Sequence, residues 1–303
     1  MRYLLRKSVI GSVPEIDITE AQYLEFQHAW KVLKDSLGIE ETYEMLLSNY
    51  ADLEREMHDA TLSHMIHSGP GYSDFFQIKL SLNMRLVNVL TAARLYIDQL
   101  PHYVRNCLPH DESINNSIKM LFSKEYDGCF EYRFMEALRN YVQHRGTPVH
   151  WTSLPGGWTS FEENGELEFS LNMGSLRSVL QEDNDFKKSV LKEMDEKVDL
   201  KAATRCYIEC ISRVHCAARR MIAESSKVAR ALIEKAHKQY SEAYDGNLVG
   251  LSACAWSDEE DDITEISSVP LMLDWDDIRL RLIERNGEMV NLRKRYVTGR
   301  NVK

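Results

Sequence analysis

An arginine and a histidine five residues apart, Arg139 and His144, have the residue types and the spacing that suit acid–base chemistry on a phosphate. They lie in residues 131–144, E-Y-R-F-M-E-A-L-R-N-Y-V-Q-H, whose apolar residues recur at the spacing of an amphipathic helix. At about 100° per residue, Asn140 and His144 fall on one face of that helix, and Arg139 and Gln143 fall on the adjoining face. The pattern therefore predicts a cation, an amide and an imidazole close together at a helix end.

These side chains suit the cleavage of RNA without a metal ion. RNA carries its own nucleophile, the 2′-hydroxyl, so cleavage requires a proton carrier and stabilisation of charge on the phosphate. Imidazole accepts and donates protons near neutral pH, which makes His144 the candidate proton carrier. Arg139 would hold the phosphate through its planar fork of donors, and Asn140 would orient the imidazole or bond to substrate. Gln143 and Arg145 are further candidate substrate-binding residues.

The sequence R-N-Y-V-Q-H of residues 139–144 resembles the R-x4-6-H signature of the HEPN superfamily, in which a polar residue commonly follows the arginine. The resemblance extends over roughly residues 73–240. It implies a HEPN-like helical bundle that forms a homodimer, in which two copies of the motif make a metal-independent endoribonuclease site with no cofactor and no metal ion. It also implies a toxin or a defence effector that acts on RNA and is controlled by an antitoxin or another regulatory protein.

The same residues also have a purely structural interpretation. Arg139 could pair with a nearby glutamate, and His144 could cap the C-terminal end of its helix, where the helix dipole favours an imidazolium. The chain would then be a non-catalytic HEPN-like binding or scaffold protein. Cys206 and Cys210 share a face of a later helix, and we interpret them as small buried thiols rather than metal ligands.

Composition limits the classes of function. The net charge of −10 and the pI near 5.5 argue against a protein that coats nucleic acid through a general positive field. The apolar N-terminal run is too short for a signal peptide, and no stretch approaches the length of a membrane span. The six cysteines contain no C-x-x-C pair and are expected to be reduced thiols. These features predict a cytoplasmic protein.

The elements that must position the motif are predicted to be mainly α-helical. Apolar periodicity predicts helices at residues 17–37, 40–66, 74–104, 113–122, 186–198 and 199–240, in addition to the motif helix, which Gly146 and Pro148 end. Turn signals after the motif predict a β-hairpin within residues 151–171. The resulting division is an N-terminal helical segment (1–70), a HEPN-like bundle with the motif helix and the inserted hairpin (71–245), and a small mixed C-terminal segment (246–303).

The two flanks carry the remaining predictions. Residues 2–10 are expected to form a short edge strand, and Asp17 with Glu20 has the spacing of a helix capping box. In the C-terminal segment, residues 271–275 and 289–297 are predicted as strands and residues 278–283 as a short helix. An acidic run at residues 257–262 is expected to face solvent. The basic end at residues 293–303 could contact RNA phosphates, although a solvated tail is the more common role of such an end.

Overall fold

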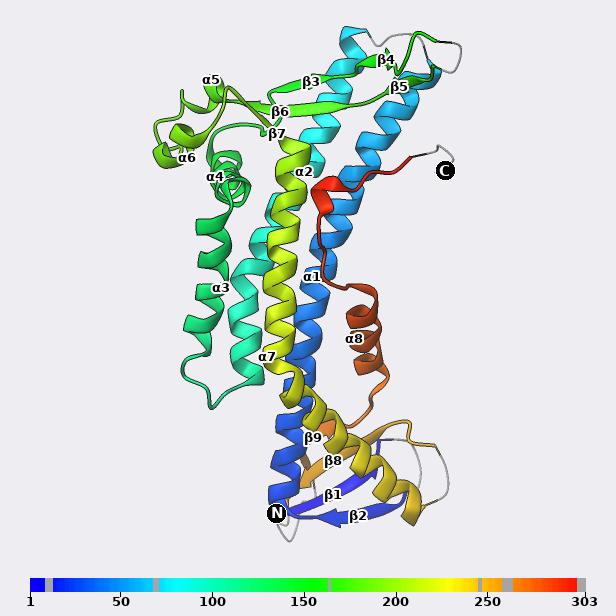
Figure 1. The fold of residues 1–303 in the computed structure, drawn as a ribbon. Helices are drawn as coiled ribbons and strands as arrows, with labels where there is room; N and C mark the ends of the chain where they lie inside the picture. The colour runs from blue at the N-terminus through cyan, green and yellow to red at the C-terminus, as the bar shows by residue number, and fades with distance from the viewer. Residues whose placement is uncertain (9–12, 68–70, 163–164, 245–246, 258–263, 299–303) are drawn as a thin grey trace. The chain divides into compact units, whose positions relative to one another are not determined.

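A computed structural model describes residues 1–8, 13–67, 71–162, 165–244, 247–257 and 264–298. The chain is mainly α-helical, as the sequence predicted (Figure 1). The helices are α1 (Glu20–Ile66), α2 (Tyr72–Cys107), α3 (Ile114–Gly128), α4 (Phe130–His144), α5 (Arg177–Leu180), α6 (Lys188–Glu193), α7 (Leu200–Ala243) and α8 (Asp274–Arg285). In the part of the chain that is described, none of these helices has both the length and the apolar character needed to cross a membrane.

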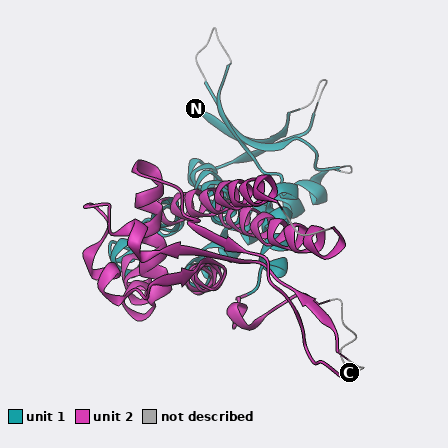
Figure 2. Ribbon diagram, turned by 90° about the horizontal axis from the view of Figure 1, so that it is seen from above, with its two compact units in different colours: residues 1–41, 99–117, 217–287 teal, residues 42–98, 118–216, 288–303 magenta. Residues whose placement is uncertain are grey.

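The chain divides into two compact units, each built from separate stretches of sequence (Figure 2). The first comprises residues 1–41, 99–117 and 217–287, and the second comprises residues 42–98, 118–216 and 288–303. Helices α1, α2 and α7 each contribute residues to both units, so this division differs from the three consecutive segments that the sequence suggested. The positions predicted as boundaries, at residues 69–70 and 245–246, lie outside the described residues.

The first unit contains an antiparallel sheet with the strand order β2-β1-β8-β9. Its strands are β1 (Arg2–Lys7), β2 (Glu15–Ile18), β8 (Leu251–Trp256) and β9 (Glu265–Pro270). The predicted N-terminal strand is present, but it pairs on both sides and is not an edge strand. The strands predicted at residues 271–275 and 289–297 are wrong, because α8 begins at Asp274 and a 3-10 turn covers Leu292–Lys294. The acidic run from residue 258 lies outside the described residues.

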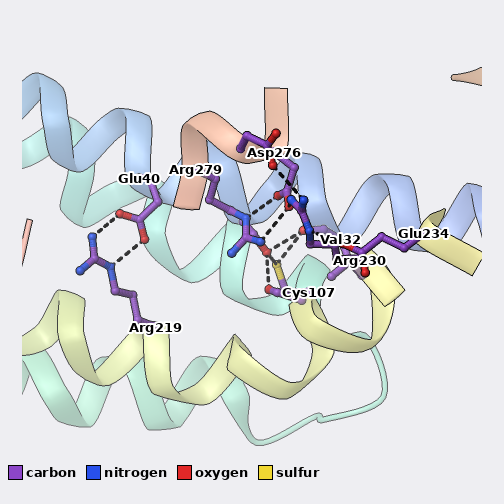
Figure 3. Close-up of polar contacts among 11 residues, drawn as sticks. Val32, Glu40, Cys107, Arg219, Arg230, Glu234, Asp276 and Arg279 are labelled. Atoms are coloured by element: carbon purple, nitrogen blue, oxygen red, sulfur yellow. Dashed lines mark hydrogen bonds and ion pairs between the residues drawn. The ribbon is translucent and has the colours of Figure 1, made fainter. Parts of the chain in front are cut away.

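Buried ion pairs also hold the first unit together (Figure 3). The Arg219 guanidinium donates to both carboxylate oxygens of Glu40, whose side chain is only 2% exposed. Asp276 has no exposed side-chain surface and pairs with Arg230 at 2.7 Å and with Arg279 at 2.5 Å. A buried charge is costly unless it is paired, so these contacts fix α1 and α8 against α7 within this unit.

In the second unit, α1, α2 and α7 meet at a buried aromatic cluster. The ring of Tyr43 stacks on that of His215 with centroids 3.7 Å apart, and the Tyr96 hydroxyl lies 2.9 Å from His215 Nδ1. Nearby on α7, Arg205 pairs with Glu54 of α1 at 2.6 Å. These contacts fix α7 against α1 and α2 in the second unit.

The second unit also contains the predicted β-hairpin, formed by β4 (Gly156–Trp158) and β5 (Leu167–Phe169). A separate antiparallel sheet has the order β3-β6-β7, with β3 at Trp151–Ser153, β6 at Asn172–Leu176 and β7 at Lys197–Asp199. The helix predicted over residues 186–198 is therefore wrong in extent. Only α6 is helical there, because the end of the segment pairs with β6.

Two features of α1 explain errors in the predicted helix boundaries. Gly38 does not end the first helix; a Cβ at this position would lie 2.8 Å from Tyr103 Cε1, so the glycine permits close approach of α2 within the first unit. The capping box is formed by Thr19 and Gln22, two residues later than predicted. Gln22 N donates to Thr19 Oγ1 at 3.2 Å, and Thr19 N donates to Gln22 Oε1 at 2.9 Å.

The predicted cap of α7 is present and can be tested. Asp199 Oδ1 accepts hydrogen bonds from the backbone N–H groups of Lys201 at 2.9 Å and Ala202 at 3.2 Å. We expect Asp199→Ala to lower the free energy of unfolding by about 1 kcal/mol in urea denaturation, whereas Asp199→Asn should retain most of it. Asp195→Ala, at an exposed position four residues before Asp199, is the matched control. Equal losses for the two alanine variants would contradict the capping role.

Candidate functional site

The motif lies at the end of α4, where the sequence predicted it. The apolar face of this helix is buried, as expected, and consists of Tyr132, Phe134, Met135, Ala137 and Leu138. At the C-terminal end, Arg145 N donates to Tyr141 O at 2.8 Å. A Cβ at Gly146 would lie 2.5 Å from the Tyr141 hydroxyl, so a larger residue there would require the Tyr141 ring to move. The predicted helix and its predicted end are both confirmed.

The rotation of α4 about its axis is fixed by contacts with α7. The ring centroids of Tyr132 and Tyr207 are 5.0 Å apart, and the fully buried Tyr207 hydroxyl donates to Glu136. Arg94 of α2 lies 3.8 Å from the same carboxylate. Burial, together with the charge of Glu136, raises the pKa of Tyr207 well above its ordinary value, so the phenol remains a donor at neutral pH.

A pocket of about 560 Å³ lies against this part of α4. Asn140 and His144 are both exposed, lie one turn apart and line the pocket, in agreement with the predicted face. Glu136, a further turn back, lines it as well. The complete lining consists of Tyr126, Glu136, Ala137, Asn140, Tyr141, His144, Arg145, Asp183, Asp185, Phe186 and Lys187.

Arg139 and Gln143 lie beside the pocket rather than in its lining. Arg139 Nη1 donates to Asn140 Oδ1 at 2.9 Å, so the guanidinium is joined to the lining through its neighbour. Its Nε is buried and has no hydrogen-bond partner among the described residues. Gln143 is exposed. Within one chain, Asn140 and His144 therefore line the same pocket, and Arg139 is joined to Asn140 by a hydrogen bond.

The charges around the pocket are mixed, a feature that the sequence did not predict. Arg145 pairs with Asp183 at 3.3 Å and also with Asp185, both in the loop after α5. Lys187 lies with its Nζ 4.6 Å from the ring centroid of Tyr126. Three carboxylates and two permanent cations therefore line the site. The sequence contains the acidic stretch E-D-N-D at residues 182–185, but no feature of the sequence indicates that this stretch pairs with Arg145.

The contact that orients α4 gives a test of stability. Tyr207→Phe removes the buried donor to Glu136, and we expect the free energy of unfolding to fall by about 1.5–3 kcal/mol, because hydrogen bonds to charged groups contribute about that much. Tyr72→Phe removes a hydroxyl from a residue that is 90% exposed and should leave stability unchanged. Urea denaturation of both variants checks this. Two variants of equal stability would show that the hydroxyl does not hold the helix.

No protein-family model matches this chain, and no curated protein and no solved structure has significant similarity to it.

Proposed function

We propose that the chain is a metal-independent endoribonuclease that acts as a homodimer, with His144 as its proton carrier. The observation that supports this most directly is the position of His144 and Asn140, exposed and one helical turn apart on an open pocket. The hydrogen bond from Arg139 to Asn140 adds a guanidinium within reach of the same surface. The resemblance of residues 139–144 to the HEPN motif provides the reaction class.

In the proposed reaction, the 2′-hydroxyl oxygen attacks the adjacent phosphorus and the bond to the 5′-oxygen breaks. One group must accept the proton of the 2′-hydroxyl, and another must give a proton to the departing 5′-oxygen. One imidazole serves one of these steps, so a two-fold dimer that pairs two motif helices would supply both. The products would be a 2′,3′-cyclic phosphate and a 5′-hydroxyl.

Charge on the transferring phosphate would be stabilised by Arg139, whose planar guanidinium can donate two parallel hydrogen bonds to phosphate oxygens. Gln143, exposed on the adjoining face, and Arg145 are the proposed substrate-binding residues. Arg145 is paired with Asp183 and Asp185, so RNA would have to replace these carboxylates as its partner. A local site of this kind is compatible with a chain whose net charge is −10.

The proposed test is cleavage of structured and unstructured RNA by the purified protein in EDTA, with identification of the product ends. We expect His144→Ala to reduce the rate by about 10²–10⁴-fold, because that is what a positioned proton carrier contributes. Arg139→Ala should reduce it by a similar factor. The controls are Arg55→Ala, at an exposed position on α1, and His67→Ala, at an exposed position just after α1. Both variants should cleave like the wild type.

A mixing experiment tests the dimer. If each site uses the imidazoles of two chains, unfolding and refolding wild-type protein with an equimolar amount of the His144→Ala variant should lower the activity of the wild-type chains by about half, because random pairing leaves only about half of them with a wild-type partner. A mixture in which the wild-type chains keep their full activity, with a dimer present by light scattering, would argue against a shared site. A monomer with full activity would remove the dimer from the proposal.

We further propose that the activity serves as a toxin or a defence effector held in check by an antitoxin or another regulatory protein. Induced expression should then slow growth of the host, and His144→Ala should relieve the effect. The resemblance alone supports this role.

The second candidate is a non-catalytic HEPN-like module that binds a protein partner. The carboxylates of Asp183 and Asp185 beside Arg145 favour it, because an acidic rim would attract a basic segment of a partner and repel RNA. If the wild type and the His144→Ala variant leave every RNA intact, while Asp183→Asn weakens capture of a basic peptide, the pocket is a protein-binding site.

A further inference from the structure

Three cysteines, one just before α4 and two on α7, lie close together near the start of α4. Cys129 immediately precedes this helix, and Cys206 and Cys210 lie one turn apart on α7. Their sulfur atoms all lie within 4.8 Å of one another, and the Sγ atoms of Cys129 and Cys206 are 3.2 Å apart. We call these residues the three-thiol cluster. Sequence reasoning paired Cys206 with Cys210 but did not bring Cys129 to them, because 77 residues separate it from the first of the two.

The cluster has the dimensions of a site for a thiophilic metal ion. Zinc binds thiolate sulfur at about 2.3 Å in tetrahedral geometry, which places its sulfur ligands about 3.8 Å apart. The Cys129 thiol also lies 3.4 Å from a carboxylate oxygen of Glu131. In a tetrahedral site with one oxygen ligand, sulfur and oxygen are separated by about 3.5 Å. The three sulfurs therefore match three ligands of a tetrahedral site, and the Glu131 carboxylate, which lies beside Cys129 but is not within 4.8 Å of all three sulfurs, would turn toward them to complete it.

The charges around the cluster suit a bound cation with three thiolates. Arg213 donates to Cys210 Sγ at 3.1 Å and is itself held by Glu125 at 2.6 Å and Glu209 at 3.1 Å. A hydrogen-bond donor oriented in this way would stabilise a metal-bound thiolate without itself touching the metal ion. Three thiolates, the Glu131 carboxylate and one divalent ion would leave a charge of −2, half of which the Arg213 guanidinium would offset.

We propose that the three-thiol cluster binds one zinc ion, with the Glu131 carboxylate as the fourth ligand. Four protein ligands make this a closed, structural site rather than one with a position for substrate. The ion would fix the residue that precedes α4 to α7. Because Cys129 precedes Arg139 by ten residues, the ion lies about 15 Å along the helix from the motif, and the proposal is independent of RNA cleavage.

Cobalt(II) is the probe for this site. The full-length protein is reduced, freed of metal under nitrogen and titrated with Co²⁺. We expect an intense sulfur-to-cobalt charge-transfer band that saturates at about one ion per chain, with strong visible bands of tetrahedral Co²⁺. Zn²⁺ should abolish both, and zinc should raise the melting temperature. No charge-transfer band in the wild type would overturn the proposal.

Substitutions show which residues hold the ion. Cys206→Ser, a nearly isosteric change at a half-buried position, should lower zinc affinity by more than about 100-fold. That loss is larger than the roughly 10- to 100-fold loss expected when a residue that only supports a ligand is changed. Arg213→Gln should lower the affinity by about 10- to 100-fold, and Glu131→Gln should keep the charge-transfer band but shift the visible bands. Cys216→Ser, on the same helix but outside the cluster, is the matched control and should bind zinc like the wild type.

Two results would contradict the zinc site. The first is a wild type and a Cys206→Ser variant that bind Co²⁺ with the same spectrum. The second is a disulfide between Cys129 and Cys206, found by mass spectrometry in protein trapped with a thiol-blocking reagent at lysis, which would make the cluster a redox pair instead.

Discussion

The geometry of the candidate site depends on how α4 is rotated about its own axis, and a buried tyrosine sets that rotation. Tyr207 is fully buried, and a buried hydroxyl without a hydrogen-bond partner is costly, so its bond to Glu136 is maintained. Once Glu136 is turned toward α7, the helical repeat places Asn140 and His144 along the same edge, one and two turns further on. Those side chains line the pocket for this reason. A helix held only by its apolar face could roll and carry them away from it.

The sequence predicted the features that depend on neighbours close in the chain. Apolar spacing alone was enough to place α4, because Phe134, Ala137 and Leu138 recur with the period of a helix and are buried as expected. The glycine and proline after the motif were enough to end it, and Asp199 was enough to start α7. The mainly α-helical class follows from the same local patterns.

The features that the sequence did not reveal depend on residues far apart in the chain. Residues 197–199 form the strand β7 because they pair with β6. The acidic residues belong to the pocket because Asp183 forms an ion pair with Arg145, which precedes it by 38 residues. Gly38 looked like a helix end, yet its role is to admit the ring of Tyr103. Glycine inside a helix costs only about 1 kcal/mol relative to alanine, which is less than the packing of a long helix contributes. Tertiary contacts therefore determine whether a helix ends at a glycine or continues through it.

Contacts along the whole of α4 connect the thiol chemistry at its start with the motif at its end. Cys129 meets α7 just before the first residue of α4, Glu136 meets it in the middle of the helix, and Tyr141 packs against the turn at Gly146. Residues 206, 207 and 210 of α7 thus lie opposite the first half of α4. Because the backbone hydrogen bonds of this 15-residue helix resist local bending, contacts at its start and in its middle hold it as one rigid piece. The three-thiol cluster contributes no side chain to the pocket at the other end of the helix, so it supports α4 without taking part in the chemistry proposed for His144.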